Sequence, residues 1–250
     1  MDQLSLLELH SRRNSKVSDK WELYLSIYEE LFLPFRYKTG ALLEIGVQNG
    51  GSLDTWSEYF TGFTSIIGCD IDPKCGNLTY HDPRIKVVVG NATDPNVVNY
   101  LHAYNDKFTL IIDDGSHLPF DVIRSFILLF PHLAPGGLYA IEDTHVFYGP
   151  VPGGGILNPG SIQNAFKQLT DSLNRQFWQN DVDWRLLFQG LFPHKDSVSE
   201  VFNGNWIRSI RFYNSMIVIE KEREETINKL GARMRVGTKM DVQDWSKINQ

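Results

Sequence analysis

Cysteine is scarce in this sequence: the 250 residues include only Cys69 and Cys75. Two cysteines are too few for a disulfide framework, and their spacing is not that of paired metal ligands. The scarcity excludes the small secreted domains that depend on disulfides and is typical of a protein in a reducing compartment. We therefore expect a cytoplasmic protein.

Long apolar runs, a targeting signal and an excess of positive charge are missing as well. No run approaches the roughly 20 residues that a membrane-spanning helix needs. The first residues show no basic stretch followed by an apolar one, which is the pattern of a secretory signal. There are 24 Lys and Arg against 30 Asp and Glu, a formal net charge of -6. Because nucleic-acid binding needs a basic face, we expect no nucleic-acid partner. Because no apolar run is long enough, we expect no membrane span.

Apolar residues are abundant enough for a sizeable core. They make up 42% of the sequence and include 15 Phe, 10 Tyr and 6 Trp. Neither an internal repeat nor a domain boundary is visible. We predict a single domain over residues 1–250, with an N-terminal helical cap over 1–38 and a lid or substrate insertion over 144–204.

Strand-like runs alternate with helical patterns through the middle of the chain. The expected strands cover residues 41–46, 65–70, 85–89, 108–113 and 138–141. This alternation predicts a parallel sheet with helices on both faces. Two further strands, 206–213 and 215–220, would add an antiparallel hairpin. We predict an α/β fold with a seven-stranded, mostly parallel sheet.

Two segments flank this central pattern. Residues 2–38 have helical periodicity, with Ser18 and Asp19 as candidate N-caps. Lys20, just inside the cap, has no partner visible in the sequence. After the fifth expected strand, a helix is predicted from Gly160 to about Trp178.

Acidic residues end the fourth and fifth expected strands. Because the carboxyl ends of parallel strands meet at one edge of a sheet, we expect four carboxylates to lie together. Carboxylates that share a site repel each other unless a cation lies among them, so this pattern predicts a hard-metal site. The four are Asp113, Asp114, Glu142 and Asp143, and two histidines are expected at the rim, His117 and His145.

A glycine-rich turn joins the first expected strand to a helix that begins near Ser52. Backbone N–H groups of such a turn can line a ligand pocket. The spacing, Glu44-x-Gly46-x-x-x-Gly50, departs from the G-x-G-x-x-G of dinucleotide-binding turns. The acid at its start suits a ligand with a cationic end, such as an ammonium or a sulfonium group. A simple strand-to-helix turn is the alternative.

The other strand ends offer further ligand contacts. Asp70 could accept hydrogen bonds from ribose hydroxyls, and Asn91 with the backbone of Ala92 could hold an adenine edge. Asp94 could contribute to the same edge, but its place before a proline favours a helix cap. Asp113 could accept from backbone N–H groups or from a methionine ammonium, and both roles stay open.

The run from 44 to 143 resembles the class I S-adenosylmethionine-dependent methyltransferases, which have a glycine turn, an acid and an Asn-Ala pair after successive strands. Four motifs narrow the resemblance: Ser-Asp-Lys at 18–20 with Tyr24 and Tyr28, Asp-Asp-Gly-Ser-His at 113–117, Pro-Gly-Gly-Leu-Tyr-Ala-Ile-Glu-Asp at 135–143 and Phe-Tyr-Asn-Ser-Met-Ile-Val-Ile-Glu-Lys at 212–221. They are similar to those of the metal-dependent sugar O-methyltransferases of the mycinamicin VI 2''-O-methyltransferase type. The insertion after Asp143 does not match those enzymes.

This resemblance implies a Rossmann-like class I methyltransferase fold, S-adenosylmethionine and Mg²⁺ as cofactors, and methylation of a sugar hydroxyl of a glycoside, natural product or polysaccharide. It implies a general base, His117. It implies three metal ligands, Asp114, Glu142 and Asp143. The residues expected to bind the cofactor are Glu44, Gly46, Ser52, Asp70, Asn91, Ala92 and Asp113.

Other functions fit parts of the same pattern. Methylation of a catechol or another small-molecule diol needs the same metal chelation. A non-catalytic cofactor-binding scaffold in glycan biosynthesis and an NAD-type oxidoreductase are two more alternatives. His145 is read as a contact around the site or as a residue without a role in it. We also expect a homo-oligomer, a dimer or a tetramer.

Overall fold

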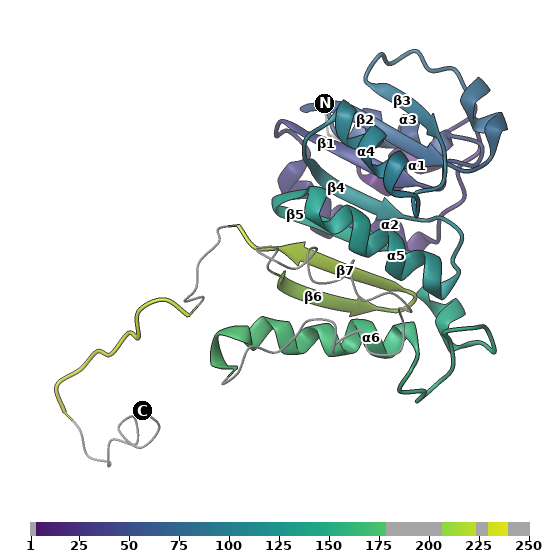
Figure 1. The fold of residues 1–250 in the computed structure, drawn as a ribbon. Helices are drawn as coiled ribbons and strands as arrows, with labels where there is room; N and C mark the ends of the chain where they lie inside the picture. Colours follow the sequence, from purple (N-terminus) through teal and green to yellow (C-terminus); the bar gives the residue numbers. More distant parts are fainter. Residues whose placement is uncertain (1–3, 179–206, 224–229, 240–250) are drawn as a thin grey trace.

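The computed structural model describes residues 4–178, 207–223 and 230–239. Its centre is a seven-stranded sheet with the order β3-β2-β1-β4-β5-β7-β6 (Figure 1). The strands are β1 (Gly40–Ile45), β2 (Phe63–Asp70), β3 (Ile85–Val89), β4 (Phe108–Asp113), β5 (Leu133–Ile141), β6 (Ile207–Tyr213) and β7 (Met216–Lys221). Strands β1 to β5 pair in parallel, and β7 pairs antiparallel with β5 and β6. The predicted sheet and its closing hairpin are confirmed.

Helices cover both faces of this sheet, which explains why its central strands are apolar on both sides. Successive residues of β1, Leu42 and Leu43, are both fully buried but belong to different hydrophobic cores. One core contains α1 (Leu6–Ser11), α2 (Glu22–Phe32) and α3 (Gly51–Tyr59). The other contains α4 (Pro95–Tyr104), α5 (Pro119–Leu129) and α6 (Ile162–Gln168). Short 3-10 helices are η1 (Leu33–Phe35), η2 (Pro73–Asn77), η3 (Phe130–His132), η4 (Thr144–Tyr148) and η5 (Leu169–Phe177).

The N-terminal cap is built differently from the expectation. Instead of one helical stretch, α1 and α2 are separated by residues 12–21, which form neither helix nor strand. The predicted N-caps Ser18 and Asp19 are wrong, because the N-cap of α2 is Trp21, which makes no side-chain cap hydrogen bond. The segment before α2 lies along the carboxyl edge of the sheet, where the backbone N–H of Gly51 donates to the carbonyl of Val17 at 3.0 Å.

The insertion after β5 also differs from its prediction in the part that is described. The expected single helix ends at Gln168 and continues as the 3-10 helix η5. Hydroxyl groups of Thr170 and Ser172 bond to carbonyls three residues earlier, a local competition that disfavours a regular α-helix. Residues 179–204 of the predicted lid lie outside the described part of the chain. Among the described ranges, no helix is long and apolar enough to cross a membrane.

The strand order places a site. The chain runs outward from β1 to β2 and β3, then returns to β4 on the other side of β1. Ligands of open α/β sheets bind at such a reversal, outside the carboxyl ends of the strands. The ends of β1 and β4 therefore define the region where side chains from distant segments converge.

Candidate active site

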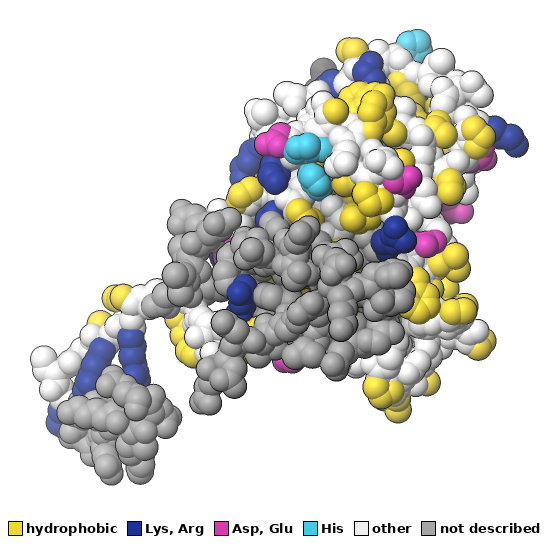
Figure 2. Space-filling view, viewed as in Figure 1, with side chains coloured by type: hydrophobic (Ala, Val, Ile, Leu, Met, Phe, Trp, Pro, Cys, Tyr) yellow, Lys and Arg dark blue, Asp and Glu magenta, His cyan; other side chains and the backbone are white. Residues whose placement is uncertain are grey.

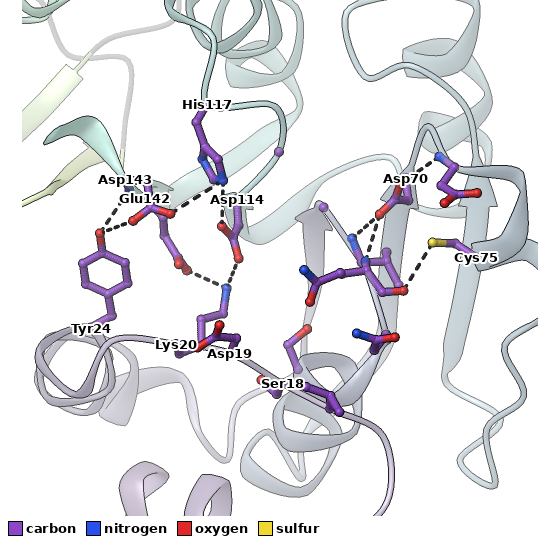
Figure 3. A pocket seen from close by; sticks show the side chains of 18 of the residues that line it. Ser18, Asp19, Lys20, Tyr24, Asp70, Cys75, Asp114, His117, Glu142 and Asp143 are labelled. Atoms are coloured by element: carbon purple, nitrogen blue, oxygen red, sulfur yellow. Dashed lines mark hydrogen bonds and ion pairs between the residues drawn. The ribbon is translucent and has the colours of Figure 1, made fainter. Parts of the chain in front are cut away.

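A cavity of about 850 Å³ lies at the carboxyl edge of the sheet. Figure 3 shows Asp70 and Cys75 at one end of it and Tyr24, Glu142 and Asp143 at the other. A second cavity of about 210 Å³ shares three lining residues with the first, Gly46, Asp70 and Gly115. The two cavities together offer an elongated site with a strongly acidic end.

The glycine turn after β1 lets two strand ends approach each other. Gly46 has a φ of +87°, and a side chain there would overlap the carbonyl oxygen of Asp114. Gly50 has a φ of +80° and is the N-cap of α3, where a side chain would overlap the hydroxyl of Tyr80. Both positions need glycine for conformation and for space. The predicted turn is therefore a close crossing of backbones at the cavity wall.

Asp70 holds this turn in place. Its Oδ2 accepts backbone N–H groups of Val47 at 2.7 Å and Gln48 at 2.9 Å, and its Oδ1 accepts that of Asp72 at 2.8 Å. Burial raises the pKa of Asp70, but these three donors outweigh it and leave the pKa below its ordinary value. The carboxylate is charged at neutral pH and lines both cavities.

The acidic end contains a group of three possible cation ligands. Asp114, His117 and Asp143 each offer one atom, and these atoms all lie within 4.8 Å of one another. The Nε2 atom of His117 is 3.6 Å from Oδ2 of Asp143 and 3.8 Å from Oδ1 of Asp114. His117 does not cap α5, whose N-cap is Leu118. Two carboxylates and an imidazole at this separation fit a divalent cation.

Two of these residues and a neighbouring serine have left-handed backbone conformations. His117 has a φ of 53°, Asp143 a φ of 54° and Ser215, in the β6–β7 turn, a φ of 65°. For residues other than glycine this region costs of order 1 kcal/mol, and it is enriched at functional sites. The chain therefore keeps three strained residues around one acidic group.

Glu142 is turned away from that group of three ligands. It is buried, and its Oε1 accepts from the hydroxyl of Tyr28 at 2.7 Å and from Nζ of Lys20 at 2.9 Å. Burial raises the pKa of Glu142, and the neighbouring Lys20 opposes that rise. Of the three expected metal ligands, Asp114 and Asp143 lie with His117, while Glu142 faces Lys20 (Figure 3).

Glu44 lies beneath the cavity and does not line it. Its Oε2 accepts from the hydroxyl of Ser52 at 2.6 Å, and its Oε1 is 3.3 Å from Nζ of Lys20. Burial raises its pKa, and Lys20 opposes the rise. The cation that this acid meets inside the protein is therefore Lys20, whereas Ser52 lines the cavity directly.

Asp113 points away from the other three carboxylates. Its Oδ2 accepts from the hydroxyls of Ser125 and Tyr139, and its Oδ1 from the backbone N–H of Gly115. Burial raises the pKa of Asp113 to about 6, against the effect of these donors. The expectation that four carboxylates meet is wrong, because adjacent residues at a strand end face opposite sides of the sheet. Asp113 instead lines the smaller cavity.

Two other expected cofactor residues line the smaller cavity with Asp113. Asn91 is exposed, with its Oδ1 accepting from the backbone of Thr93 at 2.9 Å, and Ala92 is buried. Asp94 caps α4 by accepting from the backbone of Asn96 at 2.9 Å, so the cap prediction is confirmed. Asp94 does not line this cavity.

Tyr24 holds Asp143 and also bonds to Ser215. The hydroxyl of Tyr24 is 2.8 Å from Oδ1 of Asp143 and 2.7 Å from the hydroxyl of Ser215. The same tyrosine oxygen accepts the backbone N–H of Asp143 at 3.1 Å. Nδ1 of His145 lies 2.5 Å from the Ser215 hydroxyl, which ties this histidine to the same group.

Known proteins share this architecture. No protein-family model matches the chain. It is 36% identical over 167 residues to the 8-demethyl-8-alpha-L-rhamnosyl tetracenomycin-C 2'-O-methyltransferase of Streptomyces olivaceus, covering 63% of this chain and 43% of that protein. It is 35% identical over 183 residues to the demethylmacrocin O-methyltransferase of Streptomyces fradiae, covering 68% and 45%. The matches span less than half the length of these relatives.

A solved methyltransferase structure is similar to this one over more of the chain. MycE, a methyltransferase from the mycinamycin biosynthetic pathway, in complex with Mg, SAH and mycinamycin VI, matches at a TM-score of 0.70 and 29% identity. The match covers 88% of this chain and 54% of MycE. The chain is a relative of the class I S-adenosylmethionine-dependent methyltransferases and has their fold. The resemblance to sugar O-methyltransferases inferred from the motifs is confirmed.

Sequence reasoning missed several polar residues of this methyltransferase fold. Lys20 was noted without a partner, and Tyr24 and Tyr28 were noted only beside the Ser-Asp-Lys motif, with no contact assigned to them. Both tyrosines are buried, and their hydroxyls reach Asp143 and Glu142. The Ser-Asp-Lys motif next to this tyrosine pair was the signal that could have placed them at the site.

Proposed function

We propose that this protein is a Mg²⁺-dependent S-adenosylmethionine O-methyltransferase that methylates a sugar hydroxyl. One observation carries the proposal: Asp114, His117 and Asp143 gather at one end of a cavity whose other end is formed by the glycine turn and Asp70. The relatives named above support it, because both are O-methyltransferases and the MycE complex contains Mg, SAH and mycinamycin VI.

For the metal, we assign Asp114, Glu142 and Asp143 as ligands. The separation of the atoms of Asp114 and Asp143 fits a divalent ion, and Glu142 lies next to Asp143 with one carboxylate oxygen bonded to Lys20 and Tyr28. A divalent ion bound there supplies Lewis-acid chemistry, which lowers the pKa of a hydroxyl group. An ion held by these three carboxylates would still be able to bind substrate oxygens.

His117 is assigned as the general base. Its Nε2 takes the proton of the sugar hydroxyl as the hydroxyl oxygen bonds to the methyl carbon and the carbon–sulfur bond breaks. Asp143, 3.6 Å from that nitrogen, stabilises the imidazolium that forms. General-base assistance of this kind contributes ~10²–10⁴-fold to the rate.

Binding of the methyl donor is assigned to the wall formed by the glycine turn. Gly46 and Ser52 line the larger cavity, and Asp70 lies between it and the smaller one, where a ribose would connect a methionine to an adenine. The smaller cavity, whose size suits an adenine ring, is lined by Asn91, Ala92 and Asp113. Glu44 acts from beneath, through its contacts with Ser52 and Lys20.

The acceptor is assigned to the open side of the acidic end. Trp21 and His145 line the cavity there. The residue Trp21 is 63% exposed, and the side chain of His145 is 55% exposed. A tryptophan ring offers a large apolar face beside polar groups, which suits the alternating C–H and O–H surface of a sugar. His145 contacts Ser215, which bonds to Tyr24, so it borders the metal ligands on the side assigned to the acceptor.

The domain and assembly are assigned as expected from the sequence: one domain over 1–250, with 144–204 as a lid or an oligomer contact. The described part of that segment exposes Tyr148, Ile156 and Leu157. Figure 2 shows apolar side chains gathered over this region at the lower right. A dimer or tetramer that buries them is tested by light scattering of the purified chain.

Methyl transfer itself tests the activity. The full chain is incubated with S-adenosylmethionine, Mg²⁺ and a panel of rhamnosides, macrolide glycosides and catechols, and formation of S-adenosylhomocysteine is measured with and without EDTA. We expect Mg²⁺-dependent turnover of a glycoside. Turnover of catechols alone would favour the diol methyltransferase, and S-adenosylhomocysteine binding without any turnover would favour the scaffold. Calorimetric binding of NAD in place of S-adenosylhomocysteine would overturn the proposal.

A further inference from the structure

The ammonium group of Lys20 lies where three carboxylates converge. Its Nζ is 2.5 Å from Oδ2 of Asp114, 2.9 Å from Oε1 of Glu142 and 3.3 Å from Oε1 of Glu44. Figure 3 shows Lys20 directed at Asp114 and Glu142. The Lys20 side chain is only 3% exposed, so water does not screen these contacts. A lysine this buried is rare unless it is paired.

The converging groups come from separate parts of the fold. Glu44 belongs to β1, Asp114 follows β4 and Glu142 follows β5, while Lys20 comes from the irregular segment before α2. Among the described residues, no other Lys or Arg forms an ion pair with these three carboxylates. Buried like charges repel strongly in a medium of low dielectric constant. Lys20 is therefore the cation that lets these strand ends approach one another.

Two of its partners are also the proposed metal ligands. We infer that Lys20 is a positioning residue that acts as a built-in cation: it holds Asp114 and Glu142 together in the metal-free protein and competes with the divalent ion for them. This inference rests on the proposed function, because it takes Asp114 and Glu142 to be ligands. It gives Lys20 two opposite effects, stabilisation of the metal-free fold and weakening of metal binding.

The opposite signs follow from charge. With Lys20 in place, the site presents one positive charge against Glu44, Asp114, Glu142 and Asp143. Loss of that charge leaves the carboxylates uncompensated, which lowers the stability of the metal-free protein. The same loss removes a repulsion between Lys20 and the incoming cation, which tightens metal binding. A lysine that merely supported the fold would weaken metal binding when replaced.

Substitutions Lys20→Met and Lys20→Gln test this. Methionine has a side chain of similar length without the charge, and glutamine keeps a hydrogen-bond donor. The control is Lys16→Met in the same segment, because Lys16 pairs at 3.1 Å with Asp54, outside the acidic group. Thermal unfolding is measured in EDTA and in Mg²⁺, and the affinity for Mg²⁺ alone is measured by calorimetry.

We expect both Lys20 variants to unfold at a lower temperature than the wild type in EDTA. Mg²⁺ should raise their unfolding temperature by more than it raises that of the wild type. Both should bind Mg²⁺ at least ~10-fold more tightly than the wild type does. Lys16→Met should bind Mg²⁺ as the wild type does. Unchanged or weaker Mg²⁺ binding by both Lys20 variants overturns the inference, as does failure of both to fold in saturating Mg²⁺. A wild-type chain that binds no Mg²⁺ counts instead against the proposed function.

Discussion

The hydroxyl oxygen of Tyr28 lies 2.7 Å from Oε1 of Glu142, across 114 positions of the chain. Both residues are buried, Tyr28 within α2 and Glu142 just after β5. Burial, and then the charge of Glu142, raise the pKa of Tyr28 well above its ordinary value, so the phenol remains a hydrogen-bond donor. Helix α2 therefore orients the carboxylate of Glu142, which the sheet alone would leave free to rotate.

Tyr28→Phe removes this donor and leaves the ring in place. Loss of one buried hydrogen bond to a charged group should lower the free energy of unfolding by about 1.5–3 kcal/mol. Methyl-transfer activity should fall as well, because Glu142 loses its orientation. Urea unfolding and turnover measure the two effects. The matched control is Tyr37→Phe, at a half-exposed position, and equal stability of the two variants would contradict the role of Tyr28.

His117→Ala should lower kcat by ~10²–10⁴-fold, the size expected for a lost general base. Binding of Mg²⁺ and of S-adenosylhomocysteine should persist in calorimetry, and the pH–rate profile should lose one limb. His81→Ala, at an exposed position, is the control. Loss of Mg²⁺ binding by His117→Ala would make this histidine a metal ligand. An undiminished kcat, measured where chemistry limits turnover, would leave His145 as the candidate base.

Asp143 and Asp70 lie at opposite ends of the cavity, so their substitutions should separate the two binding functions (Figure 3). Asp143→Asn should weaken Mg²⁺ binding by more than about 10-fold while the affinity for S-adenosylhomocysteine changes little. Asp70→Asn should do the reverse, with a loss of about 10-fold in S-adenosylhomocysteine affinity. Calorimetry with each ligand alone measures both. A loss of both affinities in either variant would show that the two ends are not independent.

Stability should fall in mild acid through His132. Burial, and then the neighbouring His102, lower the pKa of His132 to about 4, and the Nδ1 atoms of the two rings are 3.2 Å apart. In the unfolded chain a histidine has a pKa of about 6.5, so between those values the unfolded state binds more protons. The contribution of neutral His132 is complete above pH ~6.5 and is lost as the pH falls toward ~4.

The measurement for His132 is the melting temperature as a function of pH. His132→Gln should flatten the decline over this window relative to the wild type, because glutamine does not titrate. His10, whose pKa burial also lowers, offers a comparison at another site through His10→Gln. Identical slopes for the wild type and His132→Gln would show that His132 does not contribute to the acid sensitivity.

Local patterns determined the frame of this protein. The apolar strand runs, the glycine turn at Gly46 and the hairpin near Ser215 were all readable, since each depends on neighbours a few residues away. The parallel topology then places the ends of β4 and β5 side by side, which was enough to expect Asp114 and Asp143 in one site. The place of Asp114 beside His117 follows from one short stretch of chain, whereas Asp143 reaches them from the end of β5.

Tertiary packing decided what surrounds those acids. Lys20 reaches Asp114 across 94 positions, and Tyr24 reaches Ser215 across 191, distances over which periodicity carries no information about contacts. The direction of the Asp113 side chain was also undecided, because it depends on which face of the sheet the last residue of β4 presents. Sequence alone placed the acidic residues at one edge of the sheet. Only the folded chain could bring in the cation and the hydroxyls, because buried charges take their partners from whatever packs against them.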